Sequence, residues 1–164
     1  MKWSVTIALA LVVTGCSQEP TQAELAAERE RQVEMVRRAN DAPPLLVEVT
    51  PETIAYDDIE RWDLAGASCS YAPGTSLGAR VIAREADAFM KLDGEVIRFA
   101  ADSGSRELPA RSRSVYNGGA YSLRLDIAGA GEGADATMGE GSIWLRDRWD
   151  RVVYQGNGTV SCTG

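Results

Sequence analysis

The sequence predicts a mainly β fold, a small antiparallel barrel or sandwich, preceded by an N-terminal helical tether and one short helix. From residue 67 onward, short segments of alternating apolar and polar residues follow one another about 8–12 residues apart. The dipeptides Asp93-Gly94 and Asn117-Gly118 separate such segments, and each favours a hairpin turn because both of its residues tolerate positive φ. The chain therefore divides into a leader (1–15), a tether (16–44) and a β-rich domain (45–164).

The leader has the pattern of a secretory signal peptide. Lys2 supplies a positive charge, and residues 3–13 are mostly apolar. This run of about 11 residues is shorter than the roughly 20 residues that a membrane-spanning helix needs. Small residues follow the run, so we expect cleavage just before Cys16.

The tetrapeptide Val13-Thr14-Gly15-Cys16 resembles the lipobox of bacterial lipoproteins. The resemblance implies that the Cys16 thiol receives a diacylglycerol, that the chain is cut before Cys16 and that the new amine is acylated. More than one acyl chain anchors a protein stably. The resemblance also implies, from Ser17, a cell-envelope protein attached to the outer membrane through its lipid and facing the periplasm. An ordinary secretory peptide with an incidental cysteine is the alternative.

The tether is expected to contain a solvated helix. Thr21 and Glu24 match a capping box, in which each side chain accepts a hydrogen bond from the backbone N–H of the other residue. Helix-forming residues follow, and Glu34 and Arg38 have the i,i+4 spacing of a stabilising ion pair. Apolar residues are too sparse for a buried face, so a solvated stalk is favoured over a partner-binding helix. Pro43-Pro44 ends the helix.

Cys69 and Cys162 are predicted to form a disulfide. An exported protein folds in an oxidising compartment, and lipidation of Cys16 would leave these two cysteines as an even pair. The bond would join the first strand of the domain to the last. A redox-active or metal-bound pair is the alternative, but redox pairs usually have CxxC spacing, and the chain has no histidine to complete a metal site.

The domain is expected to begin with a short strand and a helix. Residues 45–50 are largely apolar, and Thr50-Pro51-Glu52 has the cap, the proline and the acid of a helix start. The helix would run through Leu64 and end at Gly66, with Asp57-Asp58 solvated. Further strands are expected at 67–71, 78–84, 88–92, 95–101, 113–116, 120–128, 142–147, 151–155 and 159–162, with turns at 148–150 and 156–158 and a mobile glycine-rich loop at 129–141.

The chain has no histidine, which excludes Ser-His-Asp and Cys-His catalysis and histidine-ligated metals. The net charge of −7 disfavours nucleic acid, whose phosphates attract positive surfaces. We therefore expect no enzyme activity, no cofactor, no metal and no nucleic-acid partner. A carboxylate-based envelope hydrolase is the less favoured alternative, because such enzymes need two paired carboxylates. The available acids are Asp87, Asp93, Glu95, Asp102 and Glu107, and their spacing pairs no two of them.

Four segments resemble the lipoprotein inhibitors of c-type lysozyme: residues 86–99, VYNGGAY at 115–121, SIWLRD at 142–147, and Ser161-Cys162. The resemblance implies a small β-barrel whose loop at 115–121 enters the lysozyme cleft. Only Gly118 and Tyr121 match the SGSGxxY pattern of that loop, and Val115 stands where the inhibitory serine should be.

The residues favour a non-catalytic binding module with a protein or glycan partner. The expected contact surface combines Asn117, Gly118 and Tyr121 with Trp149, which lies in the turn of the last hairpin. Trp144 is near the same turn, and at least one of the two tryptophans is expected to pack in the core. A lysozyme-inhibitor-like protein is the alternative.

Overall fold

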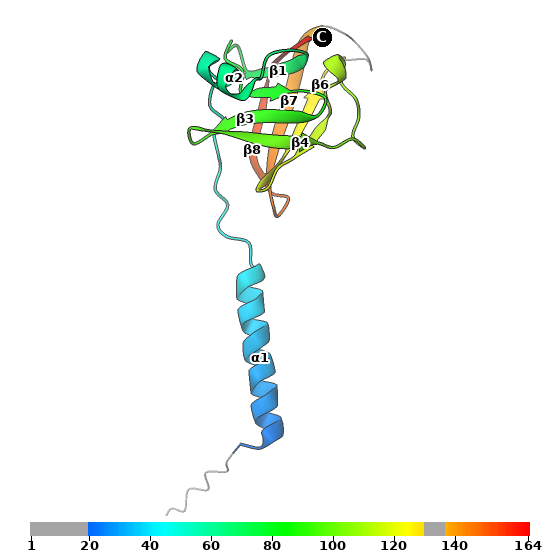
Figure 1. The fold of residues 1–164 in the computed structure, drawn as a ribbon. Coiled ribbons are helices and arrows are strands. Elements are labelled where there is room, and N and C mark those ends of the chain that lie inside the picture. Colours follow the sequence, from blue (N-terminus) through cyan, green and yellow to red (C-terminus); the bar gives the residue numbers. More distant parts are fainter. Residues whose placement is uncertain (1–19, 130–136) are drawn as a thin grey trace, which may run out of the picture. The chain divides into compact units, whose positions relative to one another are not determined.

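A computed structural model describes residues 20–129 and 137–164 (Figure 1). The predicted leader, Cys16 and most of the glycine-rich loop lie outside the described residues. The chain separates into two compact units, Met1–Ala42 and Pro43–Gly164, and each is described by itself.

The first unit contains helix α1 (Gln22–Asp41). The predicted capping box is present, because Glu24 N–H donates to the Thr21 hydroxyl at 3.3 Å and Thr21 N–H donates to the Glu24 carboxylate at 2.7 Å. Arg38 and Glu34 form the predicted ion pair at 3.0 Å. The predicted helix is therefore confirmed, and none of its residues is buried among the described residues. Its role as a solvated stalk rather than a partner-binding helix stays a prediction.

Within residues 20–129 and 137–164, no helix is both long enough and apolar enough to cross a membrane.

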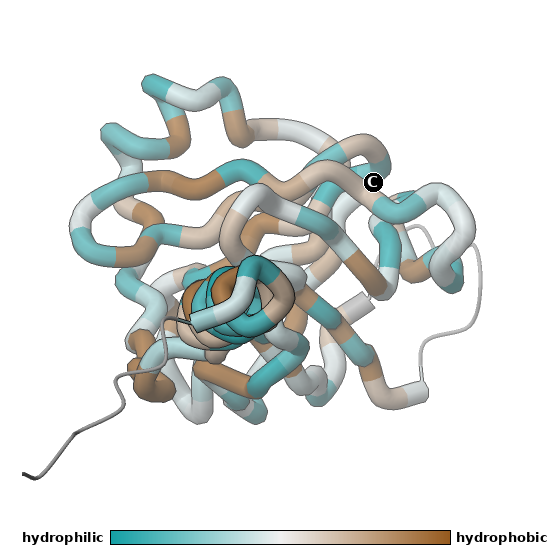
Figure 2. The backbone as a smooth tube through the Cα atoms, turned by 90° about the horizontal axis from the view of Figure 1, so that it is seen from below, coloured by the Kyte–Doolittle hydropathy of each residue, from teal (hydrophilic) through white to brown (hydrophobic). Residues whose placement is uncertain are grey.

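The second unit is an antiparallel barrel, which decides between the two predicted architectures. Among the described residues, eight strands pair in sequence order, and the last strand pairs with the first to close the sheet. Polar and apolar positions alternate along much of the barrel backbone, as expected for a sheet with one buried face (Figure 2). The strands are β1 (Ser68–Pro73), β2 (Val81–Ala83), β3 (Asp87–Leu92), β4 (Glu95–Ala101), β5 (Val115–Asn117), β6 (Tyr121–Ile127), β7 (Thr137–Asp147) and β8 (Val152–Thr163).

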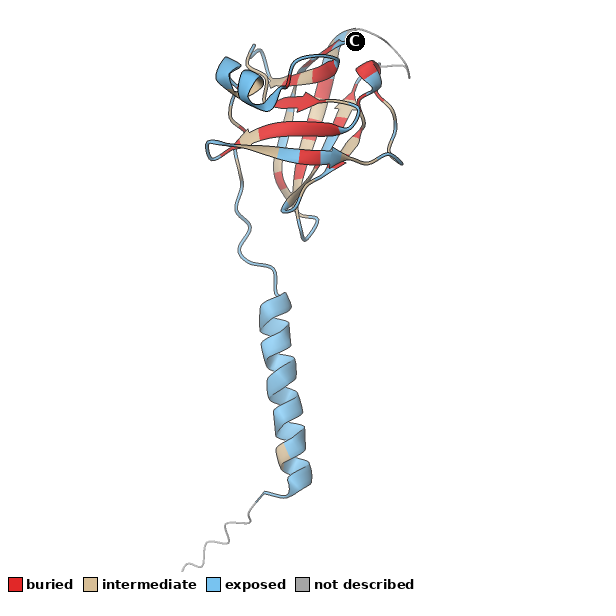
Figure 3. Ribbon diagram, viewed as in Figure 1, coloured by how far each residue is buried: buried red, intermediate tan, exposed pale blue. Residues whose placement is uncertain are grey.

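The barrel is filled by its own side chains. Each of the eight described strands contributes at least one buried residue to a single apolar cluster. The larger members of this cluster are Tyr71, Met90, Phe99 and Tyr116, all fully buried. The buried positions recur along the strands of the barrel (Figure 3). The interior of the barrel is therefore a packed core.

Helix α2 (Tyr56–Trp62) packs on the outside of the barrel. A second, smaller apolar cluster joins the flanks of this helix to β2 and β3, through Ile54, Leu64, Ile82 and Phe89. This cluster covers part of the outer sheet surface that would otherwise be exposed.

The two cysteines and the 3-10 turn η1 (Pro109–Arg111) lie together. Cys69 and Cys162 are directly opposite each other on β1 and β8, with their Cα atoms 4.0 Å apart and their sulfur atoms at bonding distance. This confirms the predicted pair. The Ser112 hydroxyl, which is fully buried, donates to the Pro109 carbonyl at 2.8 Å. The cysteines therefore belong to the packed core.

The segment that precedes β1 differs from its prediction. Residues 45–50 do not form a strand. The N–H of Val49 donates to the Val153 carbonyl at 3.0 Å, so the segment touches β8 without continuing the sheet. The apolar pattern of these residues suggested a strand, but the barrel already closes through β1 and β8.

The helix before β1 is shorter than predicted. It begins at Tyr56 rather than at Pro51, because Glu52 is held in an extended bridge to Lys91 of β3. Asp58 is not solvated as expected: its carboxylate accepts from the Lys91 ammonium at 2.8 Å and from a backbone N–H at the start of α2. The Lys91 hydrogen bond holds the pKa of Asp58 below its ordinary value.

Only one of the two dipeptide turns has the predicted form. Asp93 and Gly94 join β3 to β4 with φ of 50° and 80°, which confirms that turn. Asn117 still pairs with Ser122 inside the ladder, so the connection between β5 and β6 is a longer loop. A hydrogen bond of 2.8 Å from Gly118 N–H to the Tyr121 carbonyl closes this loop.

Strand β8 is continuous where the sequence predicts a turn and a new strand. Asn157 and Gly158 pair with Ser142 and Gly141 of β7 instead of forming a turn. A Cβ atom on Gly158 would overlap the Ala72 carbonyl of β1. The glycines here therefore permit the close approach of two strands, and they do not mark a chain reversal.

Candidate functional site

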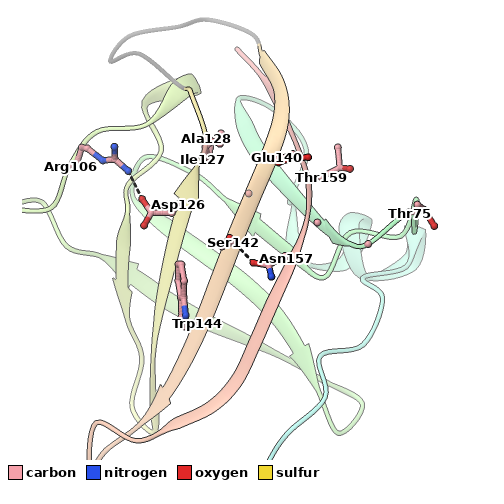
Figure 4. Close-up of a pocket in the computed structure, with 13 residues that line it drawn as sticks. Thr75, Arg106, Asp126, Ile127, Ala128, Glu140, Ser142, Trp144, Asn157 and Thr159 are labelled. Atoms are coloured by element: carbon pink, nitrogen blue, oxygen red, sulfur yellow. Dashed lines mark hydrogen bonds and ion pairs between the residues drawn. The ribbon is translucent and has the colours of Figure 1, made fainter.

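A groove of about 800 Å³ lies on the outside of β6, β7 and β8 (Figure 4). We call it the outer groove. Thr75, from the connection between β1 and β2, borders one side, and Arg106, from the loop before η1, borders the other. Between them, three strands contribute the polar and aromatic side chains Asp126, Glu140, Ser142, Trp144, Asn157 and Thr159.

The strand register places these side chains on one face. Asp126 lies opposite Ser142, and Ser142 lies opposite Asn157, so the three form one row across the sheet. In the next row, Arg124 lies opposite Trp144. The residues between these positions along each strand point into the barrel, because side chains alternate between the two faces of a strand. The alternation of side chains along β6, β7 and β8 therefore places apolar residues in the core and polar residues in the outer groove.

Asp126 is held by two arginines. Arg106 donates to one oxygen of the carboxylate, and Arg124 donates to the other at 3.1 Å. The guanidinium carbon of Arg124 also lies 6.0 Å from the centre of the Trp144 ring, at the limit of a cation–π contact. These contacts fix a carboxylate beside an aromatic ring.

A second hydrogen bond orients the amide of the groove. The Ser142 hydroxyl donates to the side-chain carbonyl of Asn157 at 2.7 Å. The Asn157 NH₂ group has no hydrogen-bond partner among the described residues, so its two donors are available to a ligand. Glu140 and Thr159 add an exposed carboxylate and an exposed hydroxyl beside this row.

The groove thus combines an aromatic ring with donors and acceptors of several kinds. A few fixed polar groups around an apolar surface are typical of sites that bind small polar molecules. Among the described residues, no group of three or more acidic or cysteine side chains is placed to hold a metal ion.

The acids considered for a hydrolase do not gather in the outer groove. Asp87 is buried and pairs with Arg84 at 2.7 Å and with Arg98 at 2.9 Å. The others lie at the turn between β3 and β4 (Asp93, Glu95) and in the loop after β4 (Asp102, Glu107). Asp87 thus serves to join β3 to β4 and to the connection before β3.

Three of the four residues of the expected contact surface do meet. Asn117, Gly118 and Tyr121 line a hollow of about 240 Å³ together with Arg148 of the β7–β8 turn. Trp149 is next to that lining and is exposed. The expectation that a tryptophan of this pair packs in the core is wrong, since Trp144 is half-buried on the outer face of β7.

Sequence reasoning missed the outer groove. Its residues come from three strands and a loop, and each one taken alone looks like an ordinary solvent-facing polar residue. In the strand at 121–127, Arg124 and Asp126 mark the solvent-facing side, but they do not indicate which residues of other strands lie beside them. Comparisons of the chain with models of protein families, with characterised proteins and with solved structures found no match.

Proposed function

We propose that this chain is a lipid-anchored envelope protein whose barrel binds a glycan in the outer groove without transforming it. The observation that carries the proposal is the row Asp126–Ser142–Asn157 beside Trp144, on the outside of a barrel whose interior is filled. Lipidation at Cys16 and attachment to the outer membrane, facing the periplasm, are part of the same proposal.

The chemistry of the groove suits a sugar. A pyranose ring has an apolar C–H face, which packs on an aromatic ring, and a rim of hydroxyl groups, which need donors and acceptors. Trp144 supplies the ring, the Asn157 NH₂ group supplies donors, and the carboxylates of Asp126 and Glu140 supply acceptors. No single charge dominates, since the two arginines on Asp126 offset the two acids.

Pre-organisation favours binding over catalysis. Both oxygens of Asp126 already accept hydrogen bonds from guanidinium groups, and the Asn157 amide is oriented by Ser142. Side chains that are fixed before the ligand arrives lose little conformational freedom on binding. The groove is therefore built to position polar contacts, and Asp126 is engaged rather than free to attack a substrate.

The first test is a titration of the unlipidated chain, residues 17–164, with soluble N-acetylated oligosaccharides from digested peptidoglycan. We expect saturable binding, and we expect Trp144→Ala to weaken it by about tenfold or more, because a tryptophan at the centre of an interface carries a large share of the affinity. Isothermal titration calorimetry measures the affinity. Trp144→Phe, which keeps an aromatic face, should lose less.

Trp62→Ala is the matched control, since Trp62 is an exposed tryptophan on α2, outside the groove. The same loss of affinity in Trp62→Ala and Trp144→Ala, or no binding by the unsubstituted chain, would contradict a glycan site in the groove. Chromatography of the oligosaccharide after incubation tests whether the protein leaves its ligand unchanged. A shortened oligosaccharide would show that the protein is a hydrolase.

A further inference from the structure

Exposed apolar side chains gather where the tether joins the barrel. Leu45, Leu46 and Val47 follow one another with exposed fractions of 91%, 50% and 69%. Trp149, in the turn between β7 and β8, is 39% exposed. We call these four residues the entry patch.

Direct contacts bring the two parts of the entry patch together. Arg151 Nη1 donates to the carbonyl of Pro44, the residue before Leu45, at 2.7 Å. The guanidinium carbon of the same Arg151 lies 5.1 Å from the centre of the Trp149 ring. The apolar segment and the turn tryptophan therefore belong to one surface.

Arginine completes this surface. Arg148 is exposed, its guanidinium carbon lies 5.3 Å from the centre of the Trp149 ring, and it has no carboxylate partner among the described residues. Tryptophan prefers the depth of lipid headgroups, and arginine extends its apolar stem along an apolar layer while its charge reaches the phosphates. Leucine and valine beside them fit the acyl boundary.

We infer that the entry patch docks the barrel onto the surface of a lipid bilayer. The exposed leucines, valine and tryptophan suit the acyl boundary and the headgroup layer, and Arg148 suits the lipid phosphates, so the composition of the patch carries the inference. The inference rests on the proposed function only in that a lipid anchor would keep the barrel near a membrane. The residues of the patch and their exposure are independent of it.

Docking adds something that anchoring does not. A lipid on a solvated tether keeps the barrel near the membrane, but it leaves the barrel free to rotate. Contact through the entry patch fixes which face of the barrel points away from the bilayer. The outer groove, on β6, β7 and β8, would then have a constant orientation toward the compartment that holds its ligand.

The test uses the unlipidated chain, residues 17–164, and vesicles of equimolar phosphatidylethanolamine and phosphatidylglycerol. Co-sedimentation should show binding in the absence of any acyl chain. Trp149→Ala should lower the partition coefficient by about tenfold, as expected for moving one large apolar side chain out of water. A combined Leu45→Ser and Leu46→Ser variant should lose at least as much.

Two matched controls are available on the same chain. Trp62, on α2, is 45% exposed, and Leu77, between β1 and β2, is fully exposed, so Trp62→Ala and Leu77→Ser remove comparable side chains elsewhere. Both controls should bind vesicles like the unsubstituted chain. Far-UV circular dichroism shows that each variant is folded, and all five substituted positions are exposed, so folding should be retained.

Absence of vesicle binding by the folded chain would overturn the inference, and so would equal losses in the controls and in the patch variants. Neither result affects the outcome of the glycan titration or of the labelling of Cys16. The proposed function can therefore be correct even if the docking inference is wrong. Vesicle binding that is lost in Trp149→Ala would support docking even if Cys16 proves not to carry a lipid.

Discussion

Two tyrosines inside the barrel have opposite hydrogen-bonding environments. The Tyr116 hydroxyl donates to the Arg84 carbonyl at 2.8 Å and accepts from Arg113 N–H at 2.6 Å. The Tyr71 hydroxyl is buried with the Tyr154 hydroxyl beside it, but it makes no hydrogen bond of full geometry among the described residues. Burial favours the neutral phenol in both, raising the pKa of Tyr116 to about 12 and that of Tyr71 well above its ordinary value.

This contrast predicts opposite effects for the same substitution. Tyr116→Phe removes the hydroxyl that bonds to the Arg84 carbonyl and to the Arg113 N–H, so both backbone groups lose this partner. The substitution should lower the free energy of unfolding by about 1–3 kcal/mol. Tyr71→Phe removes a buried hydroxyl that makes no hydrogen bond of full geometry to its neighbour Tyr154, so its effect should be close to neutral or stabilising by up to about 1 kcal/mol. Urea denaturation measures both. A larger loss for Tyr71→Phe than for Tyr116→Phe would show that the Tyr71 hydroxyl has a partner, such as a water.

At the scale of elements, strand β8 depends on its glycines. Gly158 pairs with Pro73 of β1 and with Gly141 of β7, so it lies where the barrel closes. An added Cβ would overlap the backbone of Ala72 and Pro73, which cannot move aside as a flexible side chain can. The closure of the barrel therefore depends on the absence of a side chain at this point.

Gly158→Ala should accordingly lower the free energy of unfolding by about 3 kcal/mol or more, because overpacking against backbone forces the paired strands apart. Chemical denaturation followed by circular dichroism measures the loss. Gly119→Ala is the control: a Cβ at Gly119, in the loop between β5 and β6, would meet no atom within 4 Å. Equal stabilities of the two variants would contradict the close approach of β1 and β8.

Local signals predicted the elements that depend on local chemistry. The capping box of α1 and the Asp93-Gly94 turn are correct because each is decided by a few adjacent residues. The start of α2 was wrong because a distant residue, Lys91, holds Glu52 extended. The expected turn at 156–158 was wrong because the same glycines that permit a turn also permit two strands to approach closely.

The candidate site could be predicted less well than the fold. The hollow at Asn117, Gly118 and Tyr121 comes from one loop, so the chain itself keeps these residues together. The outer groove needs the register of β6, β7 and β8, and the sequence contains no sign that Asp126 faces Ser142 or that Asn157 lies one strand further. Long-range pairing is set by closure of the whole sheet, which single segments do not encode separately.

For the whole molecule, the central prediction concerns attachment. Cys16→Ala should abolish incorporation of labelled fatty acid in cells, because the thiol that would carry the diacylglycerol is gone. Gel fluorography after metabolic labelling measures this. Cys69 and Cys162 provide an internal comparison, since both are buried in the barrel core and form a pair with each other. Persistence of the label in Cys16→Ala would show that the lipobox assignment is wrong.

The contacts that the segment from Pro44 to Glu52 makes with the barrel have a mechanical consequence. Tension applied through the N-terminal side of the chain reaches the domain first at the Arg151–Pro44 hydrogen bond, then at the bond from Val49 to Val153, and then at the bridge between Glu52 and Lys91. Because tension reaches these contacts one after another, each of them can break before the next one bears the force. Beyond them, the first strand is covalently joined to the last through Cys69 and Cys162. We therefore expect the segment from Pro44 to Glu52 to detach and extend under tension before the barrel and its outer groove are deformed.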